Sequence, residues 1–152
     1  MATSESNLIL VVTRTFKTGP EKLFEAWTRP ELMKQWFHGL GDWTTPLAEA
    51  DLKVGGAWRV DMKKPDGKVY SHFGEYKAIE RPAKLVFTWH PYADKAYETL
   101  VTVRFKGLPN GTTELTLTHE GLRNDQHRAE HNGGWNGCLD SLVQFTDSRG
   151  GK

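Results

Sequence analysis

The C-terminal part of the chain carries the clearest periodic pattern of apolar side chains. Between Asp125 and Asp147, apolar residues recur every three or four positions and fall on one broad arc at 100° per residue. That arc consists of Trp135, Cys138, Leu139, Leu142, Val143 and Phe145. The opposite side carries polar residues, namely Asn136, Asp140, Gln144 and Asp147. The pattern predicts an amphipathic helix of about 34 Å, at 1.5 Å per residue.

Two polar residues lie on the apolar arc of this predicted helix. His131 lies one turn before Trp135, and Arg128 lies two turns before it. A helix that served only as core would not carry them there. The arc therefore indicates a hydrophobic site with a few polar groups.

The remainder of the chain predicts one strand, two short helices and a series of further strands. Leu8–Phe16 is rich in β-branched residues and predicts the first strand. Gly19-Pro20-Glu21 and Thr28-Arg29-Pro30-Glu31 each begin a helix, because proline fits the first helical turn. Alternating patterns then predict strands at 48–52, 57–63, 69–79, 85–90, 97–105 and 113–120. Hairpin-length connections make the sheet antiparallel, and the predicted class is α+β with the helices on one face.

Length and composition limit the classes of protein that fit. The chain has 152 residues, which predicts a single domain over 1–152 with flexible ends at 1–7 and 149–152. Its net charge is +1 and it has no basic block, which argues against a nucleic-acid partner. The longest apolar run, Leu8–Val12, is too short to cross a membrane, so we expect a cytoplasmic protein.

Several motifs along the chain carry a resemblance to a known family. The first is Pro20-Glu21-Lys22-Leu23-Phe24-Glu25-Ala26-Trp27-Thr28, with Pro30-Glu31 and Trp36 after it. Later matches are Val54-Gly55-Gly56, Gly74-Glu75-Tyr76, Leu85-Val86-Phe87-Thr88-Trp89, Thr118-His119-Glu120-Gly121-Leu122 and Gly134-Trp135. The sequence resembles the START-like, helix-grip (SRPBCC) superfamily, and within it the branch of the activator of the ninety-kilodalton heat-shock chaperone's ATPase. The match covers nearly the whole chain.

The resemblance implies a curved antiparallel sheet of seven strands wrapped around a long C-terminal helix. It also implies a cavity between sheet and helix, which relatives use for lipids, steroids, polyketides or aromatic drugs. The aromatic content of the chain agrees with such a cavity. The apolar candidates for its wall are Trp36, Phe37, Trp43, Trp58, Val60, Phe73, Phe87, Trp89, Val101, Val103, Leu117, Trp135 and Leu139. We expect no more than about half of them to contact a ligand, since protein cores are densely packed.

The polar candidates for the cavity are His119, Arg128 and His131. His119 follows Leu115 and Leu117 at period two, so it points inward if they do. It is then either a hydrogen-bonded core residue or a ligand contact. His72 and Glu75 lie on opposite faces of their strand unless a bulge intervenes at Gly74, and the sequence leaves open which one faces inward.

A metal site and the common catalytic motifs are not favoured. His127-Arg128-Ala129-Glu130-His131 has the HxxEH pattern of zinc peptidases, but a third ligand is not evident and both downstream aspartates lie on the far side of the helix. Cys138 lies on the apolar arc, which favours a core residue over a reactive thiol. We therefore expect no metal, no cofactor and no catalytic nucleophile.

These observations favour a binding protein for a hydrophobic or aromatic small molecule, rather than an enzyme. Two alternatives remain open. One is a stress-response protein that has a heat-shock chaperone as its partner. The other is a cyclase- or hydrolase-like enzyme that uses His119 and His131 as an acid–base pair. The protein is expected to be a monomer or a homodimer.

Overall fold

The predicted order of elements is confirmed. The computed structural model describes residues 8–39 and 42–149. In chain order the elements are β1 (Leu8–Phe16), α1 (Pro20–Thr28), α2 (Pro30–Trp36), β2 (Thr44–Ala50), β3 (Ala57–Lys63), β4 (Val69–Glu80), β5 (Lys84–Trp89), a short 3-10 helix η1 (Pro91–Ala93), β6 (Thr99–Gly107), β7 (Thr113–Leu122) and α3 (Asp125–Arg149). Flexible ends were expected at 1–7 and 149–152; residues 1–7 and 150–152 lie outside the described residues, and Arg149 is the last residue of α3. In the described part of the chain, no helix is long and apolar enough to span a membrane.

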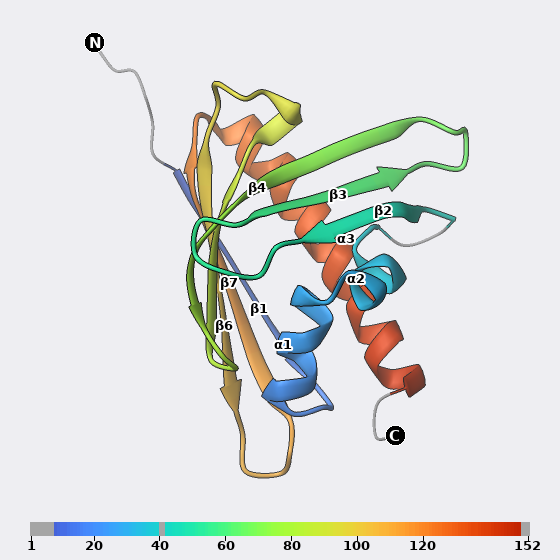
Figure 1. Ribbon diagram of the computed structural model, residues 1–152, viewed down its shortest axis with the longest axis vertical. Helices are drawn as coiled ribbons and strands as arrows, with labels where there is room; N and C mark the ends of the chain where they lie inside the picture. Colours follow the sequence, from blue (N-terminus) through green and yellow to red (C-terminus); the bar gives the residue numbers. More distant parts are fainter. Residues whose placement is uncertain (1–7, 40–41, 150–152) are drawn as a thin grey trace.

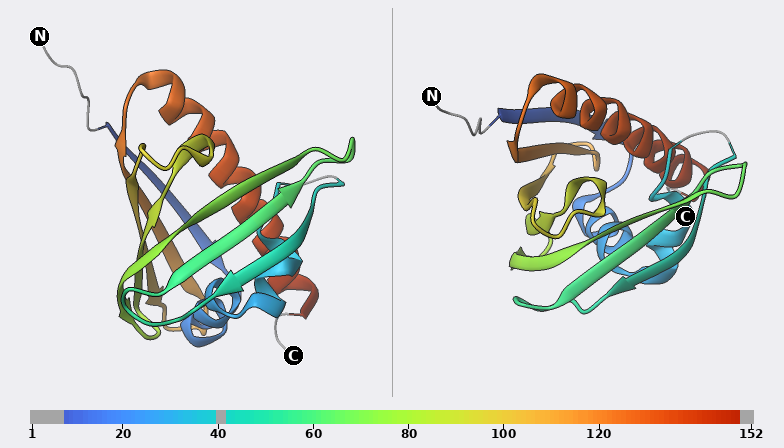
Figure 2. Two further views of the ribbon diagram at one scale, coloured as in Figure 1. Left: turned by 45° about the horizontal axis from the view of Figure 1, so that its top comes forward. Right: turned by 90° about the horizontal axis from the view of Figure 1, so that it is seen from above.

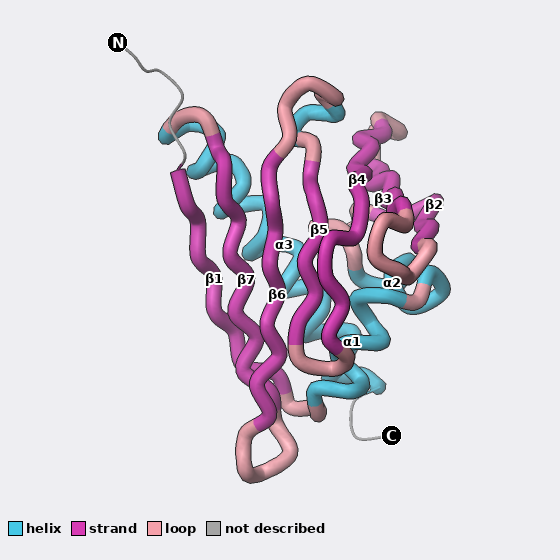
Figure 3. The backbone as a smooth tube through the Cα atoms, turned by 60° about the vertical axis from the view of Figure 1, so that its left-hand side comes forward, coloured by secondary structure: helices cyan, strands magenta, loops and turns pink. Residues whose placement is uncertain are grey.

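The strands form one antiparallel sheet of seven strands. Their order is β1-β7-β6-β5-β4-β3-β2, so every neighbouring pair except β1–β7 is also consecutive in the chain. Figure 3 shows this order across the sheet, with the helices behind it. Tight turns with glycine at positive φ connect neighbouring strands, as at Gly67 (93°) and Gly111 (81°). Such hairpins produce an antiparallel sheet because their length does not permit a crossover.

The sheet curves around the long helix α3 (Figures 1 and 2). The helices α1 and α2 lie on the same, concave side, next to the C-terminal half of α3. The β3–β4 hairpin and β2 extend past the helix, so that α3 is held between the two ends of the sheet. This is the α+β class that the residue patterns predicted, in the helix-grip architecture that the family resemblance implied.

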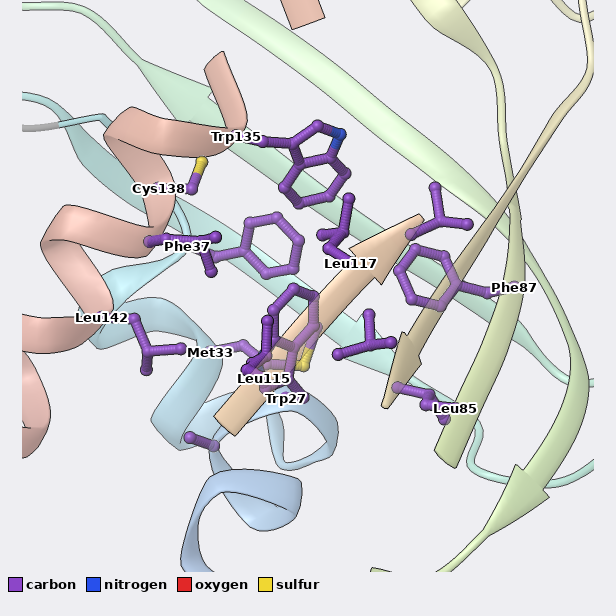
Figure 4. Close-up of a cluster of buried hydrophobic side chains, with 14 of the residues drawn as sticks. Trp27, Met33, Phe37, Leu85, Phe87, Leu115, Leu117, Trp135, Cys138 and Leu142 are labelled. Atoms are coloured by element: carbon purple, nitrogen blue, oxygen red, sulfur yellow. The ribbon is translucent and has the colours of Figure 1, made fainter. Parts of the chain in front are cut away.

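The core between the helices and the sheet is centred on Trp27 of α1 (Figure 4). The Trp27 ring lies 4.8 Å from the Trp36 ring and 6.2 Å from the Trp135 ring, measured between centroids. Phe37, directly after α2, and Phe87 of β5 also pack against the Trp27 ring. Aromatic packing of this kind attaches α1 and α2 to both the sheet and α3.

The strand β2 begins earlier than the sequence predicted. It starts at Thr44 rather than near Ala48, and it runs through Pro46. The pairing with β3 shifts register between Thr44 and Leu47. Because β2 is an edge strand, Pro46 does not need an amide proton for a second neighbour, so the strand tolerates it.

The polar side of α3 contacts the sheet instead of facing only solvent. Arg14, on the inward face of β1, donates to Asp140 and, at 2.9 Å, to the Asn136 side-chain oxygen. The Asp140 carboxylate also forms an ion pair with Arg14. These bonds attach one flank of α3 to the edge strand β1, while its apolar arc faces the core.

Candidate functional site

A cavity of about 800 Å³ lies between the sheet and the N-terminal half of α3. Its volume is in the range of sites for drug-sized ligands. The wall is formed by residues of β3, β4, β5, η1, α3 and the segment between α2 and β2. These residues are Gly39, Trp43, Met62, Val69, Tyr70, Ser71, His72, Trp89, Tyr92, Ala93, Glu130, His131, Gly134, Trp135 and Cys138.

Aromatic rings form most of the interior of this cavity. Trp89 of β5 lies 4.8 Å from the His72 ring on β4, nearly parallel to it, and 4.9 Å from the Trp135 ring on α3. At the other side, Trp43 stacks on Tyr70 with 5.9 Å between centroids. Flat, polarisable walls of this kind suit an aromatic or otherwise apolar ligand.

His119 lies behind this wall, in a chain of hydrogen bonds. Trp135 Nε1 donates to His119 Nδ1 at 3.0 Å, and His119 Nε2 lies 2.7 Å from Thr99 Oγ1. Thr99 Oγ1 in turn donates to the Trp89 carbonyl oxygen at 2.7 Å. Because the Thr99 proton is used in that bond, His119 Nε2 must carry a proton and donate it to Thr99. Both nitrogens of His119 therefore have protein partners.

The His119 ring is held in its neutral form. Its pKa is lowered to about 3, mainly because burial removes the ring from water and in smaller part because of the nearby His131 ring. The Trp135 indole N–H is thus connected through one neutral imidazole and the Thr99 hydroxyl to the backbone carbonyl of Trp89. The structure places His119 as a positioning residue behind the cavity, and it is not among the lining residues.

Of the two residues on β4 that the sequence left open, His72 faces the cavity. The pairing of β3 with β4 is regular through this stretch, with Val60 opposite His72 and Trp58 opposite Gly74. The register shift of β4 comes later, between Tyr76 and Ala78. His72 therefore shares a face with buried Tyr76, whereas Glu75 is exposed and pairs with Lys77. The pKa of His72 is lowered to about 4, mainly by burial and in smaller part by His131.

The HxxEH motif at the start of α3 is used in contacts within the protein. His131 Nδ1 donates to the His127 carbonyl oxygen at 2.8 Å, and the His127 ring bonds to the Tyr97 hydroxyl at 2.9 Å. The Glu130 carboxylate accepts from the Tyr92 hydroxyl and from Gln126. Within residues 8–39 and 42–149, no group of three or more His, Cys, Asp or Glu side chains is arranged to hold a metal ion.

Two residues at the rim of the cavity have an unusual backbone conformation. Tyr92 and Ala93 of η1 both have positive φ, at 59° and 57°. Residues with a Cβ adopt this conformation at an energetic cost, which is often found at ligand sites. The Tyr92 hydroxyl donates to Glu130, and its ring lies 5.6 Å from the His131 ring. These contacts connect the rim to α3.

The structure divides the residues that the sequence proposed for the cavity into several groups. Those in the lining are Trp43, Trp89, His131 and Trp135. Those in the buried core instead are Trp36, Phe37, Trp58, Val60, Phe87, Val101, Val103, Leu117, His119 and Leu139. Phe73 lies on the other face of β4 and stacks on His90, and Arg128 forms an ion pair with Asp125.

Several lining residues were missed by the sequence argument. Met62 shares a strand face with Trp58 and Val60, and that alternation was the available signal for it. Cys138 was assigned to the core; it is buried, with its thiol pKa raised to about 12 by desolvation, and it also lines the cavity. Tyr92 and Ala93 lie in a loop without periodicity, so no pattern indicated them.

Comparison with solved structures shows the same fold in bacterial proteins. An AHSA1 protein from Silicibacter pomeroyi is 25% identical to this chain and has a TM-score of 0.80. The match covers 93% of this chain and 99% of that one. An AHSA1-like protein from Aeromonas hydrophila is 24% identical, with 94% of each chain covered and a TM-score of 0.81.

A third solved structure is that of a protein described as a chaperone activator. An HSP90 activator from Plasmodium falciparum is 30% identical to this chain and has a TM-score of 0.60. The match covers 75% of this chain and 73% of that one. No curated protein matches the sequence.

A family model matches most of the chain. The model describes the "Activator of Hsp90 ATPase homolog 1-like protein" family and matches residues 17–147, from the residue after β1 to the last turn of α3. The matched residues include both short helices, the remaining strands of the sheet and the residues that line the cavity. The chain is therefore a member of the Activator of Hsp90 ATPase homolog 1-like family.

Proposed function

We propose that this protein binds a hydrophobic or aromatic small molecule in the cavity between the sheet and α3. The observation that carries the proposal is the cavity itself, about 800 Å³ in volume and lined largely by aromatic and apolar side chains. A ligand there would contact Trp43, Trp89 and Trp135 directly. Burying its apolar surface against these rings would drive binding.

Tryptophan fluorescence and thermal stability test the proposal directly. A panel of a fatty acid, a steroid and a flavonoid is titrated into the protein, and at least one compound should quench the emission saturably. It should also raise the melting temperature, because a ligand of the folded state at 100 times its Kd adds about 2.7 kcal/mol of stability. Recovery of the compound unchanged would separate binding from turnover.

The glycines of α3 provide a matched pair of control variants. Gly134 lines the cavity, and a Cβ placed there meets no atom within 4 Å. Gly134→Phe should therefore fill the cavity without a clash at its base. Gly133 is equally open but is not a lining residue, so Gly133→Phe should keep wild-type binding. A panel that gives no response with the wild-type protein, or equal binding in both variants, would contradict the proposed site.

Contact with a heat-shock chaperone is the second candidate function. Its support is the 30% identity with a Plasmodium falciparum protein described as an HSP90 activator. The test is whether the purified protein stimulates the ATPase of a ninety-kilodalton chaperone. If it does, and if Gly134→Phe stimulates equally well, the chaperone contact lies outside the cavity and the two functions are separate.

A further inference from the structure

Polar groups lie on two facing walls of the cavity, one on the sheet and one on α3. His72 projects from β4 beside Trp89, with 4.8 Å between the ring centroids. His131 projects from α3 next to Tyr92, with 5.6 Å between centroids. Much of the remaining lining is apolar or aromatic, from Met62, Val69, Trp43, Trp135 and Cys138.

His131 offers a hydrogen-bond acceptor. Its Nδ1 bonds to the His127 carbonyl oxygen at 2.8 Å, and a carbonyl only accepts, so Nδ1 carries the proton. In the neutral ring, Nε2 then has a lone pair. The bonds of His131 within the described chain include no partner for Nε2. The matching ligand group is a hydrogen-bond donor.

His72 offers a second ring nitrogen for a hydrogen bond with a ligand, on the opposite wall. Its Nδ1 is buried and has no hydrogen-bond partner among the described residues, and the same is true of Nε1 in the neighbouring Trp89. A neutral imidazole has one donor and one acceptor nitrogen. An unpaired polar group that is shielded from water costs free energy. A ligand group that can both donate and accept a hydrogen bond would remove this cost on the β4 and β5 side of the cavity.

The lining does not favour a charged ligand group. Among the described residues that line the cavity, none is Lys or Arg. Glu130, the one carboxylate in the described part of the lining, is at the exposed rim and is bonded to Tyr92 and Gln126. A ligand carboxylate would lose its hydration and find no opposite charge, which makes its burial unfavourable.

We infer that His72 and His131 form a recognition pair for an uncharged hydroxyl group on an aromatic ligand, as in a phenol. A hydroxyl donates to His131 Nε2 and also accepts, which matches both walls. The inference rests on the proposed function, because it names the chemical class of the ligand for that cavity. The aromatic part of the ligand would then pack against the rings of Trp43, Trp89 and Trp135.

Three naphthalene compounds of similar size test this assignment by calorimetric titration at pH 7.5. They are naphthalene, 2-naphthol and 2-naphthoate, which differ in having no polar group, a neutral hydroxyl or a carboxylate. We expect 2-naphthol to bind roughly two- to tenfold more tightly than naphthalene, the effect of one added hydrogen bond. The carboxylate should bind more weakly than the phenol.

Histidine variants locate the effect in the structure. His131→Phe and His72→Phe should each reduce the preference for 2-naphthol over naphthalene, while naphthalene affinity stays within about twofold, since phenylalanine preserves the apolar wall. His90→Phe is the matched control, because His90 stacks on Phe73 and is not in the lining. It should keep the full preference.

The outcomes distinguish the inference from the proposed function beneath it. Equal affinity for naphthalene and 2-naphthol would overturn the recognition pair and leave the cavity as a ligand site. Tightest binding of 2-naphthoate would also overturn it, in favour of an anion site. A loss of naphthalene and 2-naphthol binding by the same factor in His72→Phe and His131→Phe would make the histidines structural. No binding of any compound would refute both proposals.

Discussion

Thr99→Val should destabilise the protein although it preserves the shape of a buried side chain. The Thr99 hydroxyl accepts a bond from His119 Nε2 at 2.7 Å and donates one to the Trp89 carbonyl at 2.7 Å. Valine has the same branched shape but neither bond. His119 Nε2–H is then left without an acceptor in a fully buried place.

The size of the effect follows from that unpaired donor. Leaving a buried polar group without a partner costs about 1–3 kcal/mol of unfolding free energy. In a domain of this length, 1 kcal/mol shifts Tm by about 2–4 °C, so the expected loss is roughly 2–12 °C. No cavity is formed, because the two side chains have nearly equal volume.

Urea denaturation measures this loss, and the same strand provides the control. Thr102 lies three residues further along β6, is half-buried on the other face and makes no side-chain hydrogen bond within the described chain. Thr102→Val should change stability by less than about 0.5 kcal/mol. The midpoint of Thr99→Val should fall with an unchanged m-value, which indicates lost stability and not a changed unfolded state. Equal midpoints for the two variants would refute the hydrogen-bond chain as described.

Three further predictions concern the same framework. Stability should fall as the pH falls below 6.5, because the unfolded chain then binds a proton that buried His119, with a folded pKa of about 3, does not. Between pH 8 and pH 5 His119 alone contributes a loss of roughly 2 kcal/mol, and urea curves for His119→Asn should show a flatter pH profile; an identical profile would contradict it. Gly74→Ala should cost about 1–3 kcal/mol or more, because its Cβ would lie 2.0 Å from the Thr88 carbonyl oxygen, whereas Gly133→Ala, which meets nothing within 4 Å, should stabilise α3 by about 0.5–1 kcal/mol. Leu139→Asp should prevent folding by burying an unpaired charge, while Gln144→Leu on the exposed side of α3 should leave the circular dichroism spectrum and Tm nearly unchanged.

The order of elements was predictable because each element has its own period in the sequence. The apolar arc of 125–147 could bury itself only as a helix against a partner layer, and it is α3 in the structure. Short turns at Gly67 and Gly111 left the neighbouring strands no arrangement but antiparallel pairing. These are local properties, and local physical chemistry was sufficient for them.

The wall of the cavity depends on the tertiary structure. Trp58 and Trp89 are both aromatic and both on inward strand faces, yet Trp89 lines the cavity and Trp58 does not. Trp58 is buried in the core, where its Nε1 donates to the Thr88 carbonyl. Which of them borders open space is decided by how closely α3 and η1 approach the sheet. The sequence records that a side chain is apolar, and it does not record whether its neighbours fill the space beside it.

The histidines show the same division. Alternation predicted that His119 points inward, and it does, with no exposed surface. Its role as a link between Thr99 and Trp135 required two elements far apart in the chain to meet. For His72, alternation placed it opposite Glu75, but only the pairing with β3 and the packing of Trp89 decided which of the two faces the cavity. Period two fixes relative sides of a strand, whereas the choice of the inner side is made by what packs against it.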